Sequence, residues 1–172
     1  MLKYRQDDEQ VSDGVNLLIS ILVRYPEIGT ISFDPNHESL KLTFMLSGIP
    51  SPTEFAAIKR LISDSTAAYH ELEGLKIRST DLQMTTYEQV AMLNVIRDVA
   101  TLSKSEIAIM IALLRDKFKE RLVTDYNDSM LEEDLLVQEE LIDNMLENIK
   151  KHHAAHGLIG IREDGRVLVF NK

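Results

Sequence analysis

Three histidines near the C-terminus are the residues best suited to metal chemistry, in the segment Lys151-His152-His153-Ala154-Ala155-His156-Gly157. On a helix, His152 and His156 lie one turn apart on one face, a spacing at which two imidazoles can hold zinc. A zinc-enzyme helix carries a glutamate directly after its first histidine, and here that position is His153. Because no third ligand can be identified, we expect no high-affinity metal site and no cofactor. The alternative is that these side chains cap or pack against the end of a helix.

Carboxylates dominate residues 124–149, a segment that contains no lysine or arginine. Glu139, Asp143 and Glu147 recur every four residues, so on a helix they share one face and repel one another. This pattern is typical of a solvated helix face. It also suits a basic partner and, less well, a divalent cation.

A basic segment precedes the acidic one and contains Arg115, Lys117, Lys119 and Arg121. We expect it to dock on the acidic face, either in the same molecule or in a second copy, or to contact an anionic partner. Exposed pairs of this kind affect register and salt dependence more than affinity. These basic residues and the three acidic ones are the candidate partner-binding residues.

Composition excludes several classes of function. The 172 residues include 28 acidic and 19 basic side chains, a net charge of −9 that makes nucleic acid an unlikely partner. The absence of cysteine excludes disulfides, thiolate metal sites and cysteine nucleophiles. The longest apolar stretch, residues 17–23, is far shorter than the ~20 residues that span a bilayer, and the acidic N-terminus is unlike a signal peptide. We therefore expect a cytoplasmic protein that contacts no membrane.

Apolar periodicity predicts an antiparallel α-β-β-α-β layer in residues 1–86. Leu40, Leu42, Phe44 and Leu46 alternate with more polar residues, which is the period of a half-buried strand. The sequence Ser51-Pro52-Thr53-Glu54 has a capping serine, a proline at the first helical position and a glutamate that completes a capping box. The expected helices are 8–24 and 52–73, and the expected strands are 28–33, 40–46 and 75–84. Phe44 and Ile58 should face one another between sheet and helix.

Capping-box spacing at Thr85, Ser103 and Ser129 predicts three helices in residues 87–172, at about 86–100, 104–123 and 130–155. A β-hairpin follows, and its turn is Asp164-Gly165. That turn places Ile161 opposite Leu168 and Ile159 opposite Phe170. The fold class is therefore α+β, with segments 1–86 and 87–172 forming either two domains or one shared core.

Residues 86–172 resemble the winged-helix arrangement. The resemblance rests on the three expected helices, the sequence Gly157-Leu158-Ile159 and the terminal hairpin. The resemblance implies that helix 130–155 reads DNA beside a β-wing. That helix is acidic, however, and only Lys150, Lys151, Arg162 and Arg166 would favour contact with phosphates.

We predict a non-enzymatic regulatory or adaptor protein that acts through protein–protein contacts, because no catalytic motif is found and the terminal hairpin has an edge open to a partner strand. Self-association through residues 104–155 is also expected, because an apolar stripe from Leu131 to Ile149 needs cover. The alternatives are a winged-helix-type nucleic-acid-binding regulator and a small metal-dependent enzyme using His152, His153 and His156. His70-Glu71 is interpreted as a surface pair without function.

Overall fold

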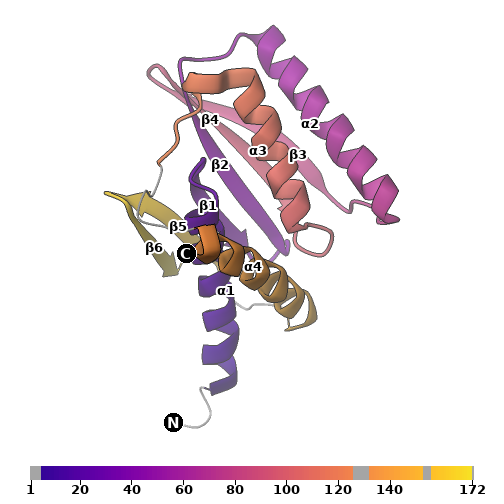
Figure 1. The fold of residues 1–172 in the computed structure, drawn as a ribbon, viewed down its shortest axis with the longest axis vertical. Helices are drawn as coiled ribbons and strands as arrows, with labels where there is room; N and C mark the ends of the chain where they lie inside the picture. The colour runs from indigo at the N-terminus through magenta and orange to yellow at the C-terminus, as the bar shows by residue number, and fades with distance from the viewer. Residues whose placement is uncertain (1–4, 126–131, 153–155, 172) are drawn as a thin grey trace.

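One antiparallel sheet of six strands forms the centre of the fold (Figure 1). The computed structural model describes residues 5–125, 132–152 and 156–171. In chain order the elements are α1 (Arg5–Arg24), β1 (Ile28–Asp34), β2 (Ser39–Ser47), α2 (Pro52–Glu73), β3 (Thr80–Tyr87), β4 (Val90–Asp98), α3 (Lys104–Phe118), the 3-10 turn η2 (Lys119–Arg121), α4 (Glu132–His152), β5 (Leu158–Glu163) and β6 (Arg166–Asn171). The α+β class expected from the sequence is confirmed.

The strands lie in the order β3-β4-β2-β1-β5-β6, and each neighbouring pair is antiparallel. Strand β5 pairs with β1, so the C-terminal hairpin belongs to the same sheet as the N-terminal strands. Residue 86, where the sequence divides into two segments, lies within the β3–β4 hairpin. Within the terminal hairpin, Ile161 pairs with Leu168 and Ile159 with Phe170, as the Asp-Gly turn predicts.

The helix expected at 86–100 is wrong, because Val90–Asp98 forms strand β4. Strand β2 pairs with β4 along its whole length, and β-branched residues such as Val95 favour the extended backbone. The spacing Thr85-x-x-Glu88 marks a tight turn instead of a helix start, and Glu88 has a φ of 54° there. The expected strand at 75–84 lies further along the chain as β3. Only two helices therefore remain of the three on which the winged-helix resemblance rests.

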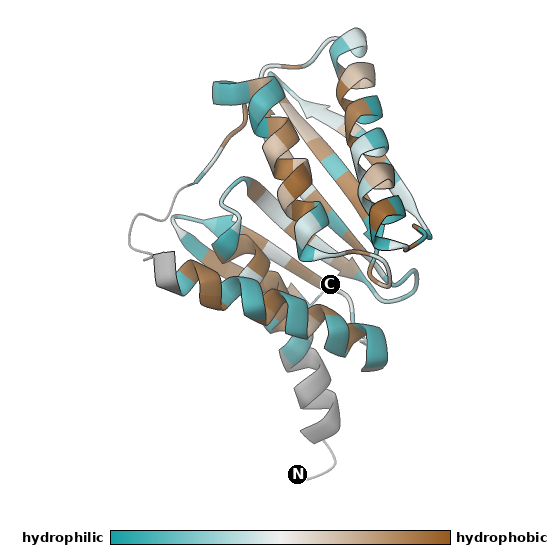
Figure 2. Ribbon diagram, turned by 45° about the vertical axis from the view of Figure 1, so that its right-hand side comes forward, coloured by the Kyte–Doolittle hydropathy of each residue, from teal (hydrophilic) through white to brown (hydrophobic). Residues whose placement is uncertain are grey.

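The helices cover one face of the sheet (Figure 2). On that face, paired residues such as Ile31, Leu42 and Val95 are buried. A methyl group added to Gly160 would lie 3.0 Å from Leu22 and 3.1 Å from Ile31, so α1 packs very closely on the sheet at this glycine. Helix α4 lies against α1 (Figure 2). No helix of the described residues lies over the opposite face.

A buried polar network joins β4 to α2 and α3. The Arg97 side chain is 1% exposed and donates from Nε to Glu106 Oε2 (2.6 Å) and from Nη2 to Glu106 Oε1 (2.8 Å). Arg97 also bonds to Asp98, while His70 Nε2 bonds to Glu106. Burial alone would lower the pKa of Arg97, but the contacts with Glu106 and Asp98 outweigh it and raise that pKa. His70 is therefore not the surface residue expected from the sequence.

Truncating the sheet–helix core should be costly, since Phe44 and Ile58 are both fully buried. We expect Phe44→Ala and Ile58→Ala each to lower the free energy of unfolding by about 2–5 kcal/mol in urea titrations. Leu72→Ala is a matched control because Leu72 is 88% exposed, and it should change stability by less than about 0.5 kcal/mol. Costs below about 1 kcal/mol at both buried positions would contradict the assignment of strand faces.

Removing the charge of Glu106 should destabilise the fold, because Arg97 would keep its buried charge without its main partner. We expect Glu106→Gln to cost about 3–5 kcal/mol, the range for breaking a buried ion pair. Glu120→Gln, at an exposed position, should have little effect. A cost below about 1 kcal/mol for Glu106→Gln would show that the network contributes little to stability.

Candidate functional site

The connection between α1 and β1, residues 25–27, forms one wall of a cleft. Pro26 cannot donate a helical hydrogen bond, so α1 ends close to it. The backbone N–H of Ile28 donates to the carbonyl of Tyr25 (3.1 Å). The N–H of Asp125 donates to the carbonyl of Pro26 (3.1 Å). The turn is thus held both locally and by the segment that follows α3.

Arg162 of β5 holds the same turn from the sheet side. Its Nη2 donates to the carbonyl oxygens of Leu22 (2.6 Å), Ile28 (3.1 Å) and Tyr25 (3.4 Å). Carbonyl groups at the end of a helix have no intrahelical donor, and the Arg162 guanidinium donates to them instead. Arg162, expected in a DNA-contacting wing, is therefore engaged inside the protein.

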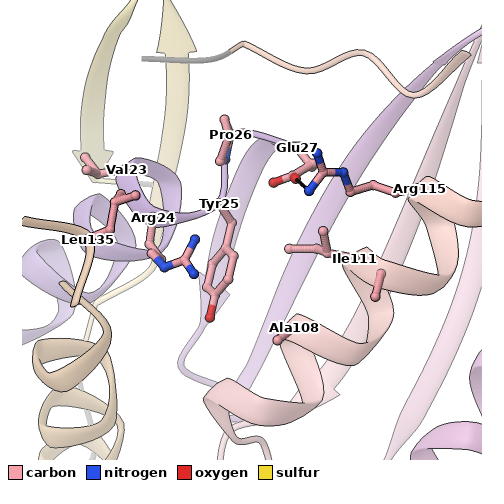
Figure 3. Close-up of a pocket in the computed structure, with 10 residues that line it drawn as sticks. Val23, Arg24, Tyr25, Pro26, Glu27, Ala108, Ile111, Arg115 and Leu135 are labelled. Atoms are coloured by element: carbon pink, nitrogen blue, oxygen red, sulfur yellow. Dashed lines mark ion pairs between the residues drawn. The ribbon is translucent and has the colours of Figure 1, made fainter. Parts of the chain in front are cut away.

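The cleft has a volume of about 330 Å³, within the range of small-ligand sites of roughly 300–1,000 Å³ (Figure 3). Its walls come from the α1–β1 turn, from α3 and from the first half of α4. Much of the lining is apolar, and charged side chains stand on the two sides of Tyr25 (Figure 3). The lining residues are Val23, Arg24, Tyr25, Pro26, Glu27, Ala108, Ile111, Ala112, Arg115 and Leu135.

Two ion pairs flank this cleft. Arg24 Nη2 lies 2.6 Å from Glu139 Oε1, and Arg24 Nε donates to the same oxygen at 2.8 Å. On the other side, Arg115 Nη1 lies 3.2 Å from Glu27 Oε2. The Glu27 side chain is only 5% exposed, whereas that of Arg115 is 52% exposed. A nearly buried carboxylate therefore faces a cation that is largely in solvent.

Burial and nearby charges both act on the pKa of the Tyr25 hydroxyl. Burial raises the pKa of its hydroxyl from 10.0 to about 12. The charge of Arg24 opposes this shift, while Glu139, Asp143 and Glu27 add to it.

The titratable groups in the cleft lining are Arg24, Tyr25, Glu27 and Arg115. The described residues lining the cleft include no serine, threonine, cysteine or histidine that could act as a nucleophile or a general base near neutral pH. The Tyr25 hydroxyl makes no hydrogen bond to the described part of the chain and, with its raised pKa, stays protonated. It can therefore donate to, or accept from, a bound group.

The acidic residues predicted from the sequence are paired within the chain. Asp143 Oδ2 lies 3.4 Å from Lys104 Nζ at the start of α3, and Glu147 Oε1 lies 3.3 Å from Lys150 Nζ. Both carboxylates are more than half exposed, so these pairs contribute little to stability. Of the predicted acidic face, Glu139 pairs with Arg24, a residue of the cleft lining.

The basic residues predicted from the sequence separate in the structure. Arg115 lines the cleft, while Arg121 Nη1 lies 3.0 Å from Glu54 Oε2 of α2. Lys117 and Lys119 are exposed, and no ion pair to the acidic face of α4 is found for them among the described residues. Docking of the basic segment on α4 therefore stays a prediction.

The apolar stripe on α4 is covered by the protein itself. Ile142, Met145 and Ile149 are buried, and α1 lies along this helix. Leu135 is half-buried and lines the cleft, and Leu131 lies outside the described residues. This burial removes the packing reason for expecting a second chain at the stripe, and self-association through residues 104–155 stays a prediction.

The histidine cluster is only partly described. His153 and the side chain of His152 lie outside the described residues, and His156 is exposed. Among the residues that are described, no group of three histidine, aspartate or glutamate side chains is placed to hold a metal ion.

Tyr25 and Glu27 were not identified from the sequence. The only local signal is that they flank a proline at the end of an apolar helix. Their burial depends on α3, on α4 and on Arg162, which are distant in the chain. The sequence therefore pointed to Arg115 and Glu139 as candidate residues, but it did not point to Tyr25 or Glu27.

Comparisons with protein-family models, with curated proteins and with solved structures give no match for this chain. No helix within the described ranges is long and apolar enough to cross a membrane.

The raised pKa of Tyr25 should be measurable by pH titration of tyrosinate absorbance. The difference between wild type and Tyr25→Phe isolates this hydroxyl, and we expect a midpoint near 12. The unfolded chain releases this proton near pH 10, before the folded chain does. The contribution of Tyr25 to stability should therefore be complete below pH 10 and decline as the pH rises towards 12. A difference titration centred on pH 10 would contradict the buried, acid-surrounded position.

Proposed function

We propose that the protein is a non-enzymatic adaptor or regulatory protein that acts through protein–protein contacts, and that its cleft receives a basic side chain of the partner. The observation that carries the proposal is the position of Glu27. Its carboxylate is almost fully buried in the cleft wall, and its ion-pair partner Arg115 is half in solvent.

A lysine or arginine side chain matches this cleft in both of its parts. The aliphatic stem of such a side chain can lie on apolar surface while the charged head stays near polar groups. Ala108 and Ile111 offer the apolar surface, and Glu27 and the Tyr25 hydroxyl offer the polar groups. The carboxylate of Glu27 adds attraction for a cation at close range.

The same charges argue against nucleic acid as the partner. The two cations of the cleft lining, Arg24 and Arg115, are each already paired with a carboxylate, and the chain has a net charge of −9. Of the basic residues expected to contact DNA, Arg162 is bonded to the α1–β1 turn and Lys150 is paired with Glu147.

The proposal can be tested by selecting ligands from a displayed library of random peptides with the full-length protein. We expect enrichment of peptides in which lysine or arginine adjoins an apolar residue. Their affinity, measured by fluorescence anisotropy, should fall about tenfold or more in Glu27→Gln, which corresponds to about 1.4 kcal/mol. Binding should also weaken as salt is raised.

Two further variants sharpen this test. Ala112→Phe should abolish binding because it fills the cleft from an exposed position of α3, where a larger side chain can be accommodated. Glu71→Gln removes an exposed carboxylate from α2 and should leave affinity unchanged. Selection of acidic peptides, or equal affinity for wild type and Glu27→Gln, would overturn the proposal.

A further inference from the structure

Strand β6 forms one edge of the sheet, and its outer side is unpaired in the described part of the chain. The Asp164-Gly165 turn, with φ values of 49° and 75°, closes a two-residue hairpin that begins with the pair Glu163–Arg166. Hydrogen-bonded and non-hydrogen-bonded pairs alternate from that point. The backbone N–H and C=O groups of Val167 and Val169 therefore point away from β5.

This edge has few of the features that protect strand edges from pairing. Natural edge strands carry prolines, lysines or bulges that block the approach of another strand. The sequence of β6 is Arg-Val-Leu-Val-Phe-Asn, and its pairing with β5 has no bulge. The other edge strand, β3, is more polar and carries Asp81.

Apolar side chains extend from this edge onto the uncovered face of the sheet. Ile159, Ile161 and Leu168 are partly exposed there, and Phe170 is 50% exposed. In the β5–β6 ladder, Ile161 lies opposite Leu168 and Ile159 opposite Phe170, so the four form one strip. A strand added to β6 would extend this apolar strip.

We propose that two copies of the chain associate through β6, paired antiparallel about a two-fold axis at Leu168. In this register Val167 of one copy lies opposite Val169 of the other, and their free backbone groups hydrogen-bond. Leu168 meets Leu168 of the second copy, and Arg166 lies opposite Phe170 of the second copy. The two sheets become one continuous sheet.

The strand is complementary to itself in this register. Leu168 forms an apolar cross-strand pair with its own copy, and the Arg166 guanidinium can lie over the Phe170 ring of the second copy. Strand β6 contains no acidic residue, so two chains of net charge −9 can approach here with least repulsion. A two-fold contact is also closed, because each β6 is used once and no fibre can grow.

The absence of native cysteine allows a register-specific test by disulfide trapping in the full-length protein. Residues directly opposite in non-hydrogen-bonded pairs have Cα atoms about 4.5 Å apart, within the reach of a disulfide. Under mild oxidation, Leu168→Cys should form covalent dimers by itself. Arg166→Cys and Phe170→Cys should crosslink with one another when mixed, several-fold more than either does alone.

Controls separate specific pairing from random oxidation. Tyr87→Cys places a thiol on the opposite edge strand, at a position whose native side chain is 69% exposed, and should stay largely monomeric. Wild type should sediment as a dimer at tens of micromolar, and Val169→Pro, which removes an outward N–H, should sediment as a monomer. If Leu168→Cys crosslinks no more than Tyr87→Cys, or wild type is a monomer, the inference fails. Neither result affects the cleft, because the two surfaces share no residue.

Discussion

The guanidinium of Arg162 links the two ends of the chain at the point on which the candidate site depends. It donates to three carbonyl groups where α1 becomes β1, from a strand more than 130 residues further along the chain. This contact caps the end of α1, helps to hold the turn that carries Tyr25 and Glu27, and ties β5 to the helix layer. Without this guanidinium the Tyr25 carbonyl would keep its hydrogen bond from the Ile28 N–H, but the Leu22 carbonyl would lose its donor at 2.6 Å. A buried carbonyl left without a partner costs about 1–3 kcal/mol.

The helices cover only one face of the sheet, which forms a cleft on that face and leaves apolar groups exposed on the other. The helices share the covered face, and the α1–β1 turn, α3 and α4 meet there around a cleft. The ion pairs that line this cleft bring residues of the α1–β1 junction together with residues of α3 and α4. The uncovered face and the β6 edge keep apolar groups such as Phe170 in contact with solvent.

A buried ion pair also holds α3 on the sheet. Arg97 and Glu106 have almost no exposed surface, and they connect β4 to the first turn of α3. Asp98 accepts hydrogen bonds in the same cluster; burial would raise its pKa, but bonds from Thr101 and Ser79 and the charge of Arg97 lower it. These interactions fix the start of α3, and the residues of α3 that line the cleft follow within four turns.

The sequence alone determined what is local: the Ser51 capping box of α2, the strand alternation of residues 40–46 and the register around Asp164-Gly165. Tertiary structure decided the rest. Residues 86–100 have the cap spacing of a helix, but full-length pairing with β2 makes β4 a strand, because long-range pairing outweighs local propensity. The charges on α3 and α4 were visible in the sequence, whereas their partners Arg24 and Glu27 were not. Ion-pair partners far apart in the chain leave no periodic signal, since only the packing of the helices brings them together.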